Sequence, residues 1–102
     1  MIFARLSVWK FKEGQHQVGL KTLYDIYLPR IKTTKGYRGH IHLMDEKDSD
    51  TIVFVTMWAT EEDLSNSKKE LFNRASKELE DYFVIMPDAS LYKVKSAELL
   101  KE

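Results

Sequence analysis

The chain has 102 residues, of which 43% are hydrophobic, so it is long enough for one domain with an apolar core and too apolar for a disordered segment. Its sixteen basic and sixteen acidic residues give a formal net charge of zero, so no general attraction to nucleic acid or an anionic membrane is expected. The absence of cysteine from the sequence excludes disulfide bonds, thiolate metal sites and cysteine nucleophiles.

The first half of the chain alternates between strand and helix periodicities. Residues 2–12 alternate as a strand does, with large apolar groups on both faces. Residues 17–32 have helical spacing, in which Pro29 is expected to kink or loosen the last turn because proline donates no amide hydrogen bond. Lys35-Gly36 predicts the end of this helix. The first strand places Ile2, Ala4, Leu6 and Val8 on one face and Phe3, Arg5, Ser7, Trp9 and Phe11 on the other.

Two strands follow, separated by the acidic hairpin loop 45–50. Residues 37–44 place Arg38, His40, His42 and Met44 on the face opposite Tyr37, Gly39, Ile41 and Leu43. Residues 51–59 are rich in β-branched side chains, which favours a central strand. Thr60 then predicts the start of a helix over 61–83, and residues 89–95 alternate as a last strand.

The order strand, helix, strand, strand, helix, strand predicts a ferredoxin-like βαββαβ fold of the α+β class, with a four-stranded antiparallel sheet and two helices on one of its faces. We expect a single domain over residues 1–95 and a short tail, 96–102, that either adds one helical turn or frays. The helices can cover only one apolar face of the first strand. A second copy is the economical cover for the other face, so a homodimer is expected.

Three segments resemble antibiotic biosynthesis monooxygenase-like (ABM) domains. The run from Thr51 to Leu64 contains an apolar strand ending in Trp58, a short polar cap and a helix start; Lys35-Gly36-Tyr37-Arg38-Gly39 and Pro29 also fit the family pattern. The resemblance spans roughly residues 1–95. It implies a dimeric α/β barrel with a pocket between the sheet and the helices of each subunit, and activities that include cofactor-free oxygenation of polyphenols or quinols, haem degradation and isomerisation of small metabolites.

The residues that mark particular branches of that family are mostly different here. At the three positions used for haem degradation the chain has Ser7, Ser67 and Lys77, and a lysine cannot replace a neutral imidazole as iron ligand at ordinary pH. A branch with a histidine early in the second helix has no counterpart in residues 70–74. The polyketide-oxidising branch pairs a tryptophan with an asparagine; Trp58 matches, but Phe54 stands at the asparagine position. Haem degradation is disfavoured, and no cofactor is expected.

If the second face of the first strand points into the pocket, Arg5 and Ser7 are the candidate polar contacts for a ligand, and Trp9, Trp58 and Phe72 its walls. Two alternatives remain open. Trp58 is of the type that fills core space and bonds its indole N–H to a nearby carbonyl. For Arg5 the favoured interpretation is an arginine satisfied by an aspartate or glutamate of a neighbouring element.

His40 and His42 lie on one face of their strand, about 7 Å apart along the backbone. They are weak candidates for an acid–base role, and alternatively lie at the surface or in a dimer contact. A metal site would need a third ligand from Asp45, Glu46 or Asp50, whose loop position argues against it, so no metal is expected. His16 is expected to be exposed to solvent.

Two functions therefore remain open: a cofactor-independent monooxygenase acting on an aromatic, quinol or polyketide-like metabolite, or a non-catalytic dimer that binds a small ligand or regulates. An open, polar-lined cavity would favour the monooxygenase. A cavity filled by Phe54, Phe72 and Tyr82 would favour the non-catalytic dimer. The sequence lacks the glycine-aromatic pattern of RNA-binding βαββαβ modules. It also lacks a membrane-length apolar run and a signal-peptide pattern, so a cytoplasmic protein is expected.

Overall fold

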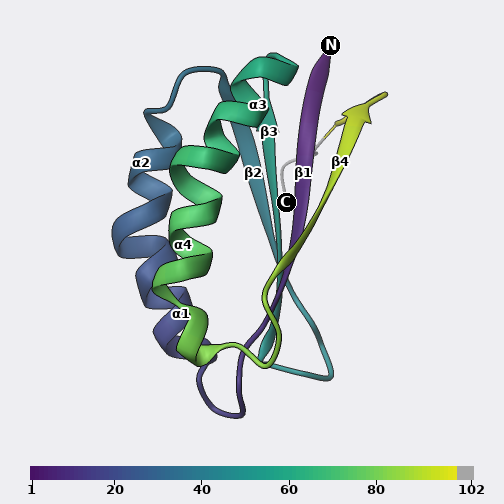
Figure 1. The fold of residues 1–102 in the computed structure, drawn as a ribbon. Coiled ribbons are helices and arrows are strands. Elements are labelled where there is room, and N and C mark those ends of the chain that lie inside the picture. Colours follow the sequence, from purple (N-terminus) through teal and green to yellow (C-terminus); the bar gives the residue numbers. More distant parts are fainter. Residues whose placement is uncertain (99–102) are drawn as a thin grey trace.

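The structure, a computed structural model, describes residues 1–98 (Figure 1). Its four strands are β1 (Ile2–Lys10), β2 (Tyr37–Met44), β3 (Thr51–Trp58) and β4 (Asp88–Val94). They form one antiparallel sheet in the order β2-β3-β1-β4. The predicted ferredoxin-like α+β fold is confirmed, with the strand over residues 51–58 inside the sheet and that over 37–44 at its edge.

The first helical segment is interrupted by a π turn just before its proline. It consists of α1 (His16–Thr22), the π turn η1 (Leu23–Tyr27) and α2 (Leu28–Lys32). The Leu28 N–H reaches back five residues to the Leu23 carbonyl, and Pro29 then falls in the first turn of α2, where a missing N–H is tolerated. The irregularity in this helix therefore lies in the turn before Pro29 and not in the last turn, where it was expected.

The predicted glycine stop of this helix is wrong. The helix ends at Lys32, and Gly36 instead forms the turn that leads into β2, with a φ of +86°. A Cβ at Gly36 would lie 2.2 Å from the Asp63 Oδ2 atom. Both the left-handed backbone and the close approach of the second helical segment require glycine there.

The second helical segment begins as predicted, because the Thr60 hydroxyl accepts a hydrogen bond of 3.0 Å from the Asp63 backbone N–H. It runs through α3 (Glu61–Ser67), the π turn η2 (Lys68–Phe72), α4 (Asn73–Glu78) and the 3₁₀ turn η3 (Glu80–Tyr82). Residues 96–98 of the predicted tail form neither helix nor strand, and 99–102 lie outside the described residues.

Both helical segments lie on one face of the sheet, and the core fills the space between the two layers (Figure 1). β1 sends Arg5, Ser7 and Trp9 into this space, so the face predicted to look toward the helices is the one that does. The core also contains Phe11, Leu23, Tyr27, Leu28, Ile31, Ile52, Phe54, Trp58, Leu64, Leu71, Ala75, Leu79 and Phe83.

The opposite face of the sheet is apolar and only half-buried within residues 1–98. Cross-strand register aligns Ile41, Val55 and Leu6 in one row across three strands, and Leu43, Val53 and Val8 in the next. Leu43 is exposed and the other five side chains are partly buried.

A bulge in β2 changes the face of one predicted residue. Tyr37 is the register partner of Trp58, whereas Gly39 is already the partner of the next residue, Met57. The extra residue, Arg38, places Tyr37 on the helix-facing side, together with His40 and His42 rather than opposite them.

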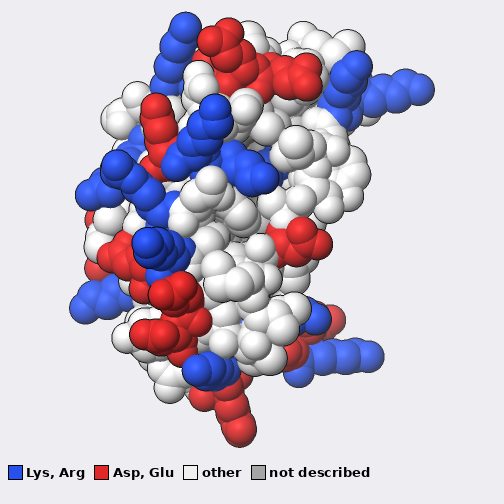
Figure 2. Space-filling view, in the orientation of Figure 1, with Lys and Arg blue, Asp and Glu red and all other residues white. Residues whose placement is uncertain are grey.

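Charged side chains of both signs are interspersed over the face seen in Figure 2, in keeping with the zero net charge. Among the residues that the structure describes, none of the helices has the length and apolar character needed to span a membrane.

Candidate functional site

A cavity of about 40 Å³ lies between the sheet and the helices. It is lined by all five predicted ligand contacts, which come from β1, β3 and the π turn η2: Arg5, Ser7, Trp9, Trp58 and Phe72. The remaining walls are mainly apolar and aromatic. A cavity of this size has room for water but not for a multi-ring ligand.

Arg5 is the most unusual group in this cavity. Its side chain is only 4% exposed, and its guanidinium group donates a hydrogen bond to the Ser67 hydroxyl and lies 5.4 Å from the centre of the Phe72 ring. Within residues 1–98 it forms no ion pair, so the predicted alternative of a carboxylate partner is wrong. Burial lowers the pKa of Arg5 to about 10, and the group is still a cation at neutral pH.

The two tryptophans satisfy their indole N–H groups in the same way. Trp9 Nε1 donates to the Ser7 hydroxyl over 2.8 Å, and Trp58 Nε1 donates to the Thr56 hydroxyl over 2.9 Å. Each hydroxyl lies two residues before its tryptophan, which places both side chains on the same face of the strand. The acceptor for Trp58 is thus a hydroxyl rather than the expected carbonyl. Trp58, 1% exposed, is a core residue that also lines the cavity.

Sequence reasoning missed Tyr27, which closes one side of the cavity. Its hydroxyl donates to the Glu78 carboxylate, and burial together with this carboxylate raises the pKa of Tyr27 to about 12. Thr56 was also missed, although its position two residues before Trp58 could have indicated it. The contact between Tyr27 and Glu78 joins the two helical segments and has no local signal in the sequence.

His40 and His42 face the helical layer but do not line the cavity. His40 Nδ1 lies 2.6 Å from the Tyr37 hydroxyl and His42 Nδ1 lies 2.7 Å from the Tyr24 hydroxyl. The His40 ring stacks on the Phe54 ring, with centres 5.5 Å apart, and the His42 ring lies tilted against it, with centres 5.7 Å apart. Phe54 itself lines the cavity, so its ring lies between the histidines and any ligand there.

Burial lowers the pKa of both histidines. The neighbouring charges of Lys32 on His40 and of His40 on His42 act in the same direction. His42 Nε2 is buried and has no hydrogen-bond partner within residues 1–98. The pair is therefore predominantly neutral near pH 7.

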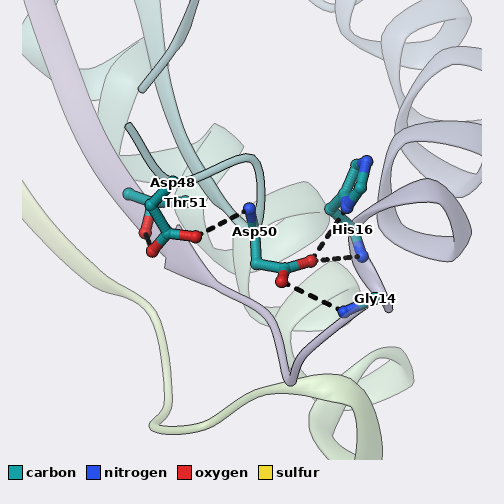
Figure 3. Close-up of polar contacts among 5 residues, drawn as sticks. All are labelled: Gly14, His16, Asp48, Asp50 and Thr51. Carbon is teal, nitrogen blue, oxygen red and sulfur yellow. Dashed lines mark hydrogen bonds and ion pairs between the residues drawn. The ribbon is translucent and has the colours of Figure 1, made fainter. Parts of the chain in front are cut away.

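Two of the three carboxylates that could complete a metal site, Asp45 and Asp50, are used elsewhere. Asp50 accepts hydrogen bonds from the Gly14 N–H, the His16 N–H and the His16 ring, the last over 2.8 Å (Figure 3). His16 is thus part-buried and paired, not free in solvent as expected. Asp45 accepts from two backbone N–H groups of its own loop. In the described part of the chain, no three acidic or histidine side chains are grouped as metal ligands would be.

No family model matches the chain, and no curated protein matches it in sequence. Solved structures match it closely in shape. SnoaB, a cofactor-independent oxygenase from Streptomyces nogalater, superimposes with a TM-score of 0.74 at 8% identity over 94% of this chain and 95% of its own. The chain has the antibiotic biosynthesis monooxygenase fold.

Two further structures share this fold. One, described as an antibiotic biosynthesis monooxygenase, has a TM-score of 0.76 and 16% identity over 92% of this chain and 99% of its own. The other is a protein of unknown function from Nitrosomonas europaea, with a TM-score of 0.80 and 16% identity over 99% of this chain and 96% of its own. The resemblance inferred from the residues is confirmed at the level of the fold. Since one fold can host many activities, evidence for an activity has to come from the residues of the cavity.

Proposed function

We propose that this protein is a cofactor-independent monooxygenase that binds a small aromatic metabolite as an anion, with the ionised oxygen beside Arg5. One observation supports this above all: a buried guanidinium group without a carboxylate partner among the described residues, set in an aromatic cavity. Removing a cation from water costs free energy unless an opposite charge compensates it. An anionic ligand would supply that charge.

The proposed chemistry needs an electron-rich anion rather than a protein nucleophile. A phenol or quinol loses a proton, and a C–H carbon of its ring forms a bond to O₂, which leaves a peroxide anion that takes up a proton. The hydroperoxide then loses water, formed from its outer O–H group and the hydrogen of that carbon, to leave a carbonyl. One oxygen atom enters the product and the other leaves as water, so the oxidation is balanced by O₂ alone. Arg5 would stabilise the anion, while Trp9 and Trp58 would orient its ring and Ser7 would contact a hydroxyl.

The test is O₂ consumption with a panel of hydroquinones and single-ring phenols. Turnover that falls at least about tenfold in both Arg5→Met and Trp58→Ala would support the proposal, since a hydrogen bond to a charged group contributes about 1.5–3 kcal/mol. Arg38→Met is the matched control, because Arg38 is exposed and, within residues 1–98, bonds only the carbonyl of its neighbour Tyr37. Turnover unchanged by Arg5→Met would refute the role of this cavity.

The small volume of the cavity favours a second candidate, a non-catalytic dimer that binds or senses a small ligand. Phe54 and Phe72 are among its walls, and among the described residues no histidine, aspartate or glutamate lines the cavity as a base. Ligand binding that quenches tryptophan fluorescence without any O₂ consumption, across the same panel, would favour this alternative over the oxygenase.

We also propose that two copies associate through the open face of the sheet. The rows containing Leu6, Ile41 and Val55 form a continuous apolar surface on the side away from the helices. Such a surface is stabilised by a second copy that removes it from water. Sedimentation should give a dimer for the wild-type protein and a monomer for Val55→Lys; a wild-type monomer at 100 micromolar (roughly the upper range of a weak association) would refute the proposal.

A further inference from the structure

A second, larger hollow lies at the edge of the two layers, between the second helical segment and the start of β4. This groove has a volume of about 520 Å³ and is lined by Lys68, Ser76, Lys77, Met86 and Ala89 among others. Uncharged side chains occupy most of the surface between the helices and β4 in Figure 2. The groove is therefore wide enough for a drug-sized molecule, which the inner cavity is not.

Phe72 is the only described residue that lines both the groove and the inner cavity. The two hollows also meet at the sheet, where Ala89 of the groove is the register partner of Ser7 of the cavity. Phe72 is the last residue of the π turn η2, in which the Asn73 N–H reaches back to the Lys68 carbonyl. Such turns are frequent at functional sites in helices.

The Phe72 ring makes the contacts that a bound aromatic ligand would make. It presents its face to the Arg5 guanidinium at 5.4 Å and meets the Trp9 ring edge-on, with ring centres 5.5 Å apart. A cation above a π face is attracted to it, but less strongly than to a full negative charge. Phe72 thus partly compensates Arg5 in the free protein.

From these contacts we infer that the groove is the access route to the cavity and that Phe72 is its gate, which an anionic aromatic ligand displaces from Arg5. The inference rests on the proposed ligand site and narrows the ligand class. The ligand carries a planar ring, which packs against Trp9 where the Phe72 ring packs in the free protein. It also carries a carboxylate, phenolate or enolate, which contacts the Arg5 guanidinium in place of the face of the Phe72 ring. The part of the ligand beyond that ring lies in the groove.

The two tryptophans of the chain make the gate measurable without turnover, because both line the cavity and are 3% and 1% exposed. In Phe72→Ala, acrylamide should quench tryptophan fluorescence with a constant about twofold higher than in the wild type, since the ring no longer separates cavity from groove. Phe3→Ala is the matched control: Phe3 is also a partly buried phenylalanine against the core but lines neither hollow.

Benzoate tests the ligand class, because it has one ring and one carboxylate. Phe72→Ala should bind benzoate about tenfold more tightly than it binds benzyl alcohol, the neutral analogue, and the double variant with Arg5→Met should lose this preference. If Phe72→Ala does not fold, Phe72→Leu should change the quenching constant and the benzoate preference in the same direction but by a smaller factor. Quenching that rises equally in Phe3→Ala, or benzoate binding that does not depend on Arg5, would overturn the inference.

Failure of the gate and failure of the oxygenase give different results. A gate that opens and admits benzoate, in a protein that consumes no O₂ with any phenol, leaves the inference standing and refutes the oxygenase. Normal O₂ consumption with quenching unchanged by Phe72→Ala supports the oxygenase and refutes the gate.

Discussion

Replacing Arg5 by methionine should leave the free energy of unfolding within about 1 kcal/mol of the wild-type value. The lowering of the Arg5 pKa to about 10 corresponds to roughly 3 kcal/mol of lost hydration. Against this stand the hydrogen bond to Ser67, contributing about 1.5–3 kcal/mol, and the contact with the Phe72 ring, contributing about 0.5–2 kcal/mol. These terms nearly cancel, so the arginine adds little to the stability of the free protein.

A structural arginine would behave differently. Removing one partner of a buried ion pair typically costs about 3–5 kcal/mol, because the other charge is left uncompensated. Within residues 1–98 Arg5 has no such partner. The two explanations of the residue therefore differ by several kcal/mol, far more than the error of a denaturation experiment.

Urea unfolding at pH 7, followed by tryptophan fluorescence, measures the difference. Protein concentration must be the same for all variants, because association would add to the apparent stability. Arg38→Met controls for the loss of one positive charge and should change stability by less than about 0.5 kcal/mol. A loss of 3 kcal/mol or more in Arg5→Met would refute the reasoning and make the residue part of the fold rather than of a ligand site.

Three further predictions concern groups around the cavity. Burial lowers the pKa of His40 and His42, so the unfolded chain binds protons near pH 6.5 that the folded protein does not. The free energy of unfolding should therefore fall as the pH drops from 7 through 6.5. The urea midpoints of a variant with both histidines changed to glutamine should show a weaker fall. In an alkaline absorbance titration one of the five tyrosines should ionise near pH 12, and Tyr27→Phe should remove this late step; if it persists, another tyrosine is responsible. Gly36→Ala should lower the free energy of unfolding, measured by thermal unfolding, by more than about 1 kcal/mol. The loss should exceed that of Gly14→Ala, because Gly14 also has a positive φ but has open space around it. Equal losses in the two variants would rule out an effect of the close contact at Gly36.

Local patterns were enough to predict which strand residues share a face. Alternation placed Arg5, Ser7 and Trp9 together, and it placed Trp58 at the end of the strand that lies beside them. The face of Tyr37 could not be predicted in this way, because one bulged residue reverses the alternation. The order of the elements was enough to predict the topology, because a short chain has few ways to join such elements.

Contacts between distant elements left no such pattern. Tyr27 and Glu78 belong to different helical segments, and their meeting depends on how the two segments pack on the sheet. Asp50 was considered as a metal ligand of the histidines on its hairpin, yet it caps the loop before the first helix through His16 (Figure 3). Carboxylates in loops have several donors within reach, and the sequence does not say which one they bind.

The composition of the cavity wall has a consequence for the proposed reaction. Among the described residues, the only titratable side chains that line it are Arg5 and Tyr27. The first is a cation at neutral pH, and the second, with a pKa of about 12, holds its proton toward Glu78. Neither can accept a proton from a phenol near pH 7, so the substrate proton must leave to solvent and the substrate must react in its ionised form.

If the proposed reaction occurs, the pH dependence of turnover should therefore follow the pKa of the substrate and not that of a protein group. For two phenols whose pKa values in water differ by two units, the midpoints of the kcat/KM profiles should differ by about the same amount, since no described residue that lines the cavity acts as a titrating base. Arg5→Met should lower the rate at every pH, because the anion loses its counter-charge. Profiles with one common midpoint for both phenols would show that a protein group takes the proton, and the histidines behind Phe54 would then be the first to examine.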